Sequence, residues 1–87
     1  MYSIEFSNRA TSELERIYEF DRKLFTRLLE AIQSLTSEPF QGKKLKRQFE
    51  GDYSLCVGTY RILYTVYRHK LVVSVIDVGH RRDIYRK

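Results

Sequence analysis

Three runs of strand-forming residues, separated only by short turns, constrain the fold of this chain more than any other feature. The runs cover residues 53–57, 60–67 and 71–78 and are rich in β-branched and aromatic side chains. Gly58 and the polar stretch 68–70 interrupt them at positions typical of turns. Because such short connections join antiparallel neighbours, the sequence predicts a three-stranded antiparallel meander.

The N-terminal part of the chain indicates a short strand followed by two helices. Residues 2–6 alternate apolar and polar side chains, which is typical of a strand with one buried face. Apolar residues then recur every three or four positions on both sides of a break near Phe20 and Asp21. Ser7 or Asn8 is the expected N-cap of the first helix, and Asp21 that of the second. The expected core-facing residues are Ala10, Leu14, Ile17, Tyr18, Leu24, Phe25, Leu28, Leu29, Ile32 and Leu35.

Together these elements predict an α+β fold in a single domain covering residues 1–87. The second helix is expected to end before Pro39, because a proline disfavours helical backbone at the residue before it. We expect the two helices to form an antiparallel hairpin. The N-terminal strand and the meander are expected to form one mostly antiparallel sheet beneath it.

Composition excludes several classes of protein. With 43% hydrophobic and 31% charged residues, the chain is typical of a folded globular protein. No apolar run approaches the roughly 20 residues that span a bilayer, and no signal peptide opens the chain, so we expect a cytoplasmic protein without a membrane partner. Cys56 is the only cysteine, which excludes an intrachain disulfide and, with only two histidines, a site of the zinc-finger type. We expect neither a metal nor a cofactor.

Positive charge is concentrated in the second half of the chain. Residues 1–40 carry five Lys/Arg against seven Asp/Glu, a net charge of −2, whereas residues 41–87 carry eleven against four, a net charge of +7. This asymmetry predicts an anionic partner, most simply nucleic acid, and the alternative is a solvated basic surface. The residues expected to contact RNA are Lys43, Lys44, Lys46 and Arg47 in a basic arm, and Arg82 and Arg86 near the C-terminus.

Two arginines flank the last predicted hairpin. Arg61 lies in the segment GTYRILY (residues 58–64), and Arg81 lies in VGHRRDIYR (residues 78–86). A charged residue within an apolar strand is costly unless it faces water, a partner or a ligand. The hairpin is expected to bring both guanidinium groups to one side, where a nearby histidine and tyrosine complete a set that suits a phosphodiester. The alternatives are an ion pair between Arg61 and Asp77 and, for Arg81 and Arg82, a solvated tail.

Side-chain alternation divides the predicted sheet into two faces. Tyr60, Ile62, Tyr64 and Val66 share one face of their strand, and the more apolar face of each strand should meet the helices. This parity leaves Ser54, Cys56 and Arg61 on the opposite, open face, unless a bulge at Gly58 inverts it. We expect the open face and the basic segments beside it to form a groove.

These segments resemble the RelE/ParE superfamily of bacterial and archaeal toxins from toxin–antitoxin pairs. The resemblance extends over essentially the whole chain, and its most specific parts are residues 58–64 and 79–85. It implies a RelE-like fold, a cognate antitoxin as partner and a toxin–antitoxin complex of higher order. The RelE branch implies a metal-independent endoribonuclease that cuts mRNA in the ribosomal A site and inhibits translation, with the ribosome and mRNA as partners.

The resemblance also implies a catalytic set of Arg61, His80, Arg81 and Tyr85. In the implied reaction a ribose 2′-OH attacks the adjacent phosphorus and leaves a 2′,3′-cyclic phosphate. Arg61 would clamp the phosphate, and Arg81 would stabilise the developing charge or assist the leaving 5′-oxygen. Tyr85 would stack on or orient a nucleotide, or alternatively pack against the sheet edge. His80 is a candidate acid or base because histidine titrates close to neutral pH.

Two positions depart from the RelE pattern. Ser54 and Cys56 stand where well-studied members carry basic residues, one of them the lysine assigned as general base. We expect Cys56 to be buried and inert, and charge to come from the arm if Lys44, Lys46 or Arg47 swings in. Catalysis is then weak, uses His80 as its base, or is lost. The alternative functions are a ParE-like DNA gyrase inhibitor and a catalytically degenerate RelE relative that only binds antitoxin or ribosome.

Overall fold

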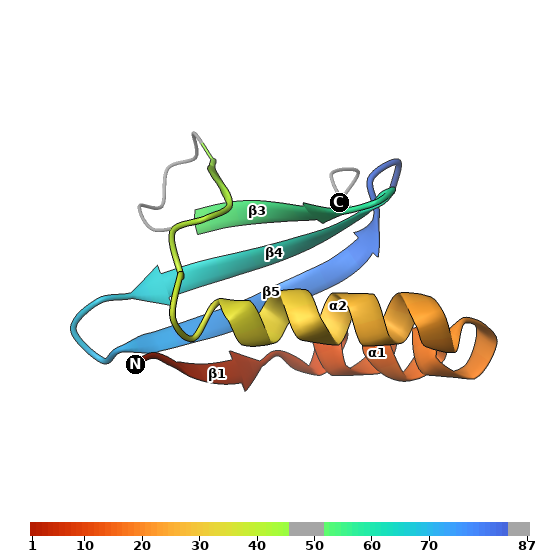
Figure 1. Cartoon of the computed structure of the whole chain (residues 1–87), viewed down its shortest axis with the longest axis horizontal. Coiled ribbons are helices and arrows are strands. Elements are labelled where there is room, and N and C mark those ends of the chain that lie inside the picture. Colours follow the sequence, from red (N-terminus) through yellow and green to blue (C-terminus); the bar gives the residue numbers. More distant parts are fainter. Residues whose placement is uncertain (46–51, 84–87) are drawn as a thin grey trace.

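The structure, a computed structural model, describes residues 1–45 and 52–83 of the chain. A helical hairpin packs on one five-stranded sheet, as Figure 1 shows. The elements in chain order are β1 (Ser3–Phe6), α1 (Asn8–Phe20), α2 (Arg22–Ser34), β2 (Lys43–Lys44), β3 (Asp52–Val57), β4 (Tyr60–Tyr67) and β5 (Val72–His80). The strand order is β1-β5-β4-β3-β2, with β1 parallel to β5 and the other pairs antiparallel. The predicted α+β fold is confirmed.

Side-chain caps define where both helices begin. The Ser7 hydroxyl accepts a hydrogen bond from the Ala10 amide at 3.0 Å, and the Asp21 carboxylate accepts one from the Leu24 amide at 3.0 Å. Each cap satisfies an amide that the first helical turn leaves without an intrahelical partner. Since Asp21 is the only residue between α1 and α2, the chain reverses sharply there, and the predicted antiparallel hairpin is confirmed (Figure 1).

The core lies between the helical hairpin and one face of the sheet. Most of the predicted helical stripe is buried, but Tyr18 is 41% exposed because it lies at the margin of that stripe. Its ring packs edge-on against Phe25, with centroids 5.0 Å apart, and the Arg22 guanidinium covers it at 4.7 Å. The buried apolar residues are Ala10, Leu14, Ile17, Leu28, Ile32, Leu35, Tyr53, Val57, Ile62, Tyr64, Val66, Val73, Val75 and Val78.

A register shift modifies the longest hairpin. Leu63 pairs with Asp77, whereas Tyr64 pairs with Val75, so Ile76 is an extra residue on β5. The turn at Gly58 does not invert the parity, because Cys56 pairs directly with Arg61. The strand β5 continues to His80, two residues beyond the predicted end, where it pairs with the start of β4.

The buried Tyr64 hydroxyl ties the sheet to the segment that leads into β2. It accepts a hydrogen bond from the Gly42 amide at 3.0 Å, and the Tyr64 side chain is almost fully buried. Burial raises the pKa of Tyr64 above its ordinary value of 10.0, because the phenolate is poorly solvated there, and the hydrogen bond from Gly42 opposes the rise.

Because the pKa of Tyr64 is raised on folding, the free energy of unfolding is expected to fall at alkaline pH as Tyr64 ionises. The folded pKa lies above the unfolded one, so the contribution is complete below pH 10 and is lost as pH rises from about 10 through the folded pKa. Replacing Tyr64 by phenylalanine is expected to cost about 1 kcal/mol at pH 7 through the lost hydrogen bond. The advantage of the parent protein should shrink above about pH 10 in urea unfolding experiments. A constant difference up to pH 11 would contradict this assignment.

Candidate functional site

Arg61 lies on the sheet face that is turned away from the helices. It is the second residue of β4 and stands in register between Cys56 on β3 and Gly79 on β5. Its Nη1 donates a hydrogen bond to the Cys56 sulfur at 2.6 Å, which directs the guanidinium toward β3. Cys56 is exposed, so the prediction of a buried cysteine was wrong. Residues of alternating parity point to opposite faces, and Cys56 belongs to the face without a helix.

The next row of that face crosses four strands. Lys43 pairs with Ser54, Ser54 pairs with Leu63, and Leu63 pairs with Asp77. Ser54 lies on the predicted side of the sheet but is only 2% exposed, so it does not line an open surface as expected. Among the described residues of this row, Lys43 is the one cationic side chain, and it is exposed.

Asp77 is the buried carboxylate of the same row. It is 3% exposed, its Oδ1 accepts a hydrogen bond from the Val78 amide at 2.9 Å, and its Oδ2 lies 3.8 Å from Arg9 Nε. Because Arg61 pairs with Gly79, Asp77 is the diagonal neighbour of Arg61 on this face. Diagonal neighbours are within reach of a long side chain, so the alternative pairing of Arg61 with Asp77 stays open.

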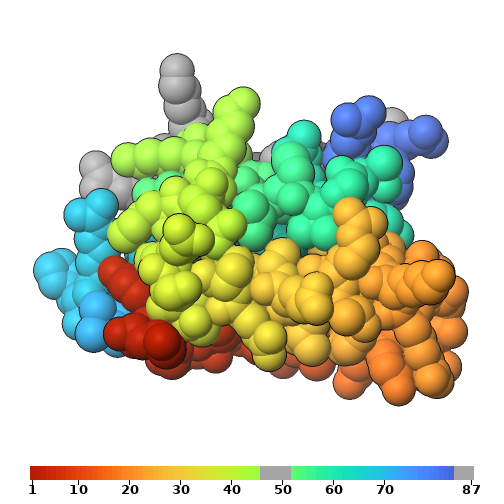
Figure 2. Space-filling view, viewed as in Figure 1, coloured from red at the N-terminus to blue at the C-terminus, as the bar shows by residue number. Residues whose placement is uncertain are grey.

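Arg81 follows the last residue of β5 and is exposed. Its amide donates a hydrogen bond to the Thr59 carbonyl at 2.8 Å, which ties it to the turn between β3 and β4. Figure 1 shows that β4 begins where β5 ends, so Arg61 and Arg81 belong to one end of the sheet. In Figure 2 the segment after β5 projects beside that turn.

His80 belongs to the opposite face of the sheet from Arg61. It pairs with Tyr60, and the two rings meet edge-on with centroids 5.7 Å apart. Tyr60 alternates with Arg61, so its side chain shares the face of the buried Ile62. The Nδ1 atom of His80 accepts a hydrogen bond from the Arg82 amide at 3.1 Å. The structure therefore brings Arg61 and Arg81 to one end of the sheet but places His80 across it from Arg61.

The basic arm is only partly described. Lys43 and Lys44 form the edge strand β2, and both side chains are exposed. Lys43 shares the face of Arg61, whereas Lys44 pairs with Tyr53 and projects to the helix side. The sequence did not assign Lys43 to that face, because a two-residue strand carries no periodicity. The predicted residues Lys46, Arg47, Tyr85 and Arg86 lie outside the described residues.

Within residues 1–45 and 52–83, no three His, Cys, Asp or Glu side chains are grouped closely enough to hold a metal ion. Neither helix in this part of the chain is long and apolar enough to cross a bilayer.

Comparison with known proteins identifies the family. Residues 4–85 match the family model of the ParE toxin of the type II toxin–antitoxin system parDE. The toxin RelG of Mycobacterium tuberculosis is 33% identical over 88 residues, which cover 99% of this chain and 98% of RelG. The chain belongs to the RelE/ParE superfamily of type II toxins. The resemblance predicted from residues 58–64 and 79–85 is confirmed.

Solved structures support the same fold for this toxin. The toxin–antitoxin complex RelBE2 of Mycobacterium tuberculosis contains a chain that is 29% identical, with a TM-score of 0.77 over 92% of this chain and 98% of that one. The intact RelBE complex of E. coli contains a chain that is 24% identical, with a TM-score of 0.77 over 92% of this chain and 96% of that one. The predicted RelE-like fold is confirmed.

Proposed function

We propose that this toxin is an endoribonuclease that cleaves mRNA in the ribosomal A site and thereby inhibits translation. The observation that carries the proposal is the placement of Arg61 and Arg81 at one end of the sheet, where β4 begins and β5 ends. Gly79, the partner of Arg61 on β5, contributes no side chain to this end of the sheet.

In the proposed reaction the 2′-oxygen of a ribose forms a bond to the adjacent phosphorus, and the bond from phosphorus to the 5′-oxygen breaks. The 2′-OH gives its proton to water and the leaving 5′-oxygen takes one from water, so the products are a 2′,3′-cyclic phosphate and a 5′-OH with no net change in protons. Arg61 would donate two hydrogen bonds to the phosphoryl oxygens and stabilise their growing charge. Its hydrogen bond to Cys56 holds the planar fork in one orientation.

Arg81 would neutralise the negative charge that develops on the leaving 5′-oxygen. The side chain is exposed, while its backbone is tied to Thr59. The His80 imidazole Nδ1 accepts a hydrogen bond from the Arg82 amide at 3.1 Å, and the His80 backbone carbonyl accepts one from the Asp83 amide at 2.9 Å. We therefore assign the His80 side chain a positioning role in the turn that presents Arg81. Tyr85 would stack on or orient a nucleotide, as expected from the sequence, and its hydroxyl would take part in proton transfer.

Lys43 would supply part of the positive charge that RelE toxins carry at the strand positions occupied here by Ser54 and Cys56. It shares a face with Arg61 and lies two strands from β4, a separation of roughly 10 Å. At that distance one charge changes the transition-state energy by roughly 0.4–1.7 kcal/mol, a factor of about 2–20 in rate.

Lys43→Ala is expected to slow single-turnover mRNA cleavage on ribosomes by this factor. Lys23→Ala, an exposed cation on α2, should leave the rate unchanged, and equal effects of both variants would contradict the assignment.

The proposal is tested by growth inhibition on controlled expression. The double variant Arg61→Ala/Arg81→Ala should lose toxicity, while Lys23→Ala/Arg27→Ala, which removes the same charge from exposed positions of α2, should keep it. If the first variant still folds and still inhibits growth, the catalytic proposal is wrong.

Two observations favour a second candidate, inhibition of DNA gyrase. The matching family model is that of a ParE toxin, and Ser54 and Cys56 occupy the strand positions of the RelE basic residues. A change in plasmid supercoiling with unbroken mRNA would support this candidate. Loss of both activities together with tight antitoxin binding would indicate a degenerate relative.

A cognate antitoxin is the proposed protein partner, in a complex of higher order in the cytoplasm. Support comes from the solved relatives in RelBE2 of Mycobacterium tuberculosis and RelBE of E. coli, which are toxin–antitoxin complexes.

A further inference from the structure

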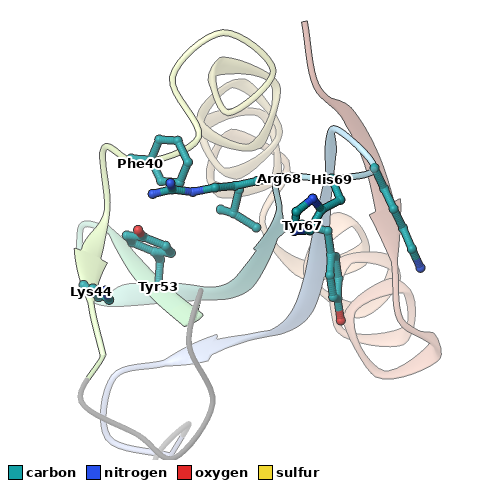
Figure 3. Close-up of a pocket in the computed structure, with 8 residues that line it drawn as sticks. Phe40, Lys44, Tyr53, Tyr67, Arg68 and His69 are labelled. Atoms are coloured by element: carbon teal, nitrogen blue, oxygen red, sulfur yellow. The ribbon is translucent and has the colours of Figure 1, made fainter.

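A second cationic surface lies at the other end of the sheet, on the face that carries the helices. Tyr67 lies six positions after Arg61 on β4, a distance of roughly 20 Å along the strand. Beyond Tyr67 the turn into β5 closes a pocket together with the segment before β2 (Figure 3). We name this surface the Phe40 pocket; Phe40, Lys44, Tyr53, Arg68, His69 and Lys70 line it together with two further residues of β4, Val66 and Tyr67.

Aromatic rings and a stacked guanidinium form the centre of the pocket. The Arg68 guanidinium carbon lies 4.9 Å from the Phe40 ring centroid, and Figure 3 shows the end of the Arg68 side chain beside Phe40. The Phe40 and Tyr53 rings meet edge-on at 5.7 Å, and Tyr53 is itself stacked on Tyr64 at 5.6 Å. Phe40 nevertheless remains 42% exposed. The pocket therefore contains two flat groups on which a ligand can stack: the Phe40 ring, which packs against Tyr53, and the Arg68 guanidinium, which packs against Phe40.

The chemistry of this lining suits an unpaired nucleotide. Bases stack on aromatic rings and on arginine planes, while lysines neutralise the phosphate. Lys44, Arg68 and Lys70 supply positive charge, and no carboxylate is among the described residues that line the pocket. An acidic peptide would satisfy the charges but would leave the exposed Phe40 ring unused, so the lining favours RNA over peptide.

The edge strand β2 connects the pocket with the candidate catalytic face. Lys43 projects to the face of Arg61 because it pairs with Ser54, whereas Lys44 pairs with Tyr53 and lines the pocket. Two adjacent cations therefore carry positive charge around the sheet edge from one face to the other.

We infer that the Phe40 pocket is an RNA subsite, which holds an unpaired nucleotide of the same strand that is bound at Arg61. The part of this inference that concerns the same strand rests on the proposed function. The subsite binds RNA and takes no part in bond cleavage, so its loss weakens binding and leaves the chemical step at saturating substrate intact.

Binding of an unstructured 12-nucleotide RNA to the free toxin tests the subsite. Phe40→Leu removes the aromatic ring at similar volume and should raise the dissociation constant about tenfold, whereas Phe40→Tyr keeps the ring and should bind like the parent. Arg68→Gln should weaken binding and reduce the salt dependence by about one phosphate contact, and Phe40→Leu should leave the salt dependence unchanged. Lys23→Ala is the matched control on α2.

Equal affinity of all these variants for RNA, or no binding by any of them at low salt, would show that the Phe40 pocket is not an RNA subsite.

Photo-crosslinking of a thiouridine-labelled mRNA on ribosomes tests whether the pocket and Arg61 bind the same RNA strand, and crosslinks to Phe40 or Tyr53 are expected. Crosslinks of the labelled mRNA to other parts of the toxin, with none to this pocket, would overturn that part. If the subsite binds RNA but no mRNA is cut, only the proposed function fails. If mRNA is cut equally at subsaturating concentrations with Phe40→Leu, only the subsite fails.

Discussion

Replacing Arg61 by alanine is expected to slow single-turnover mRNA cleavage by about 10²–10³-fold, the cost of removing one preorganised donor from a transition state. The guanidinium is positioned in the ground state, because Nη1 donates a hydrogen bond to the Cys56 sulfur at 2.6 Å. The loss should therefore fall on the rate at saturating ribosomes rather than on binding alone. Quenched-flow cleavage of a ribosome-bound mRNA measures it directly.

A matched variant separates charge from geometry at this position. Arg61→Lys keeps one positive charge but loses the planar fork that contacts two oxygens at once, so its rate should lie between those of the parent and Arg61→Ala. Urea unfolding of all three proteins controls for folding. A rate for Arg61→Ala within threefold of the parent, with intact folding, would remove Arg61 from the mechanism.

Gly42→Ala is expected to lower the free energy of unfolding by about 1–3 kcal/mol, the usual cost of forcing an extra methyl group into a packed site. A Cβ atom at this position would lie 2.6 Å from the Tyr64 hydroxyl and 2.8 Å from the Ser54 carbonyl oxygen. The carbonyl belongs to the backbone of β3, so it cannot move aside without disturbing the sheet. The hydrogen bond from the Gly42 amide to Tyr64 would be strained at the same time.

Chemical denaturation measures this loss, and Glu38→Ala provides a control in the same segment. Glu38 is exposed, so its replacement should change the free energy of unfolding by less than about 0.5 kcal/mol. A Gly42→Ala protein as stable as the parent would show that the close contacts between the β2 segment and Tyr64 do not persist in solution.

Local signals in the sequence predicted most of the fold. Ser7 and Asp21 cap their helices because their side chains accept hydrogen bonds from nearby amides, a property that needs no knowledge of the tertiary structure. Strand alternation likewise placed Cys56 and Arg61 on one face, since the turn at Gly58 keeps the register. The structure places Arg61 and Arg81 at one end of the sheet, and the expectation that both guanidinium groups lie on one side of the hairpin stays a prediction.

The remaining features depend on contacts between distant segments. The face occupied by Lys43 depends on β2, which is too short to leave a pattern, and alternation alone does not predict that Ser54 is buried. The face of His80 depends on β5 extending beyond its predicted end and on the extra residue Ile76, and neither is encoded by alternation alone. The Phe40 pocket joins residues from three parts of the chain, and no motif links them.

Mapping of mRNA 5′ ends in a reconstituted translation reaction tests the central claim most directly. We expect discrete cuts within A-site codons that require ribosomes, carry 5′-OH ends and disappear with Arg81→Ala. Intact mRNA with the parent toxin, at concentrations that arrest growth, would contradict cleavage in the A site and shift the assignment to gyrase inhibition.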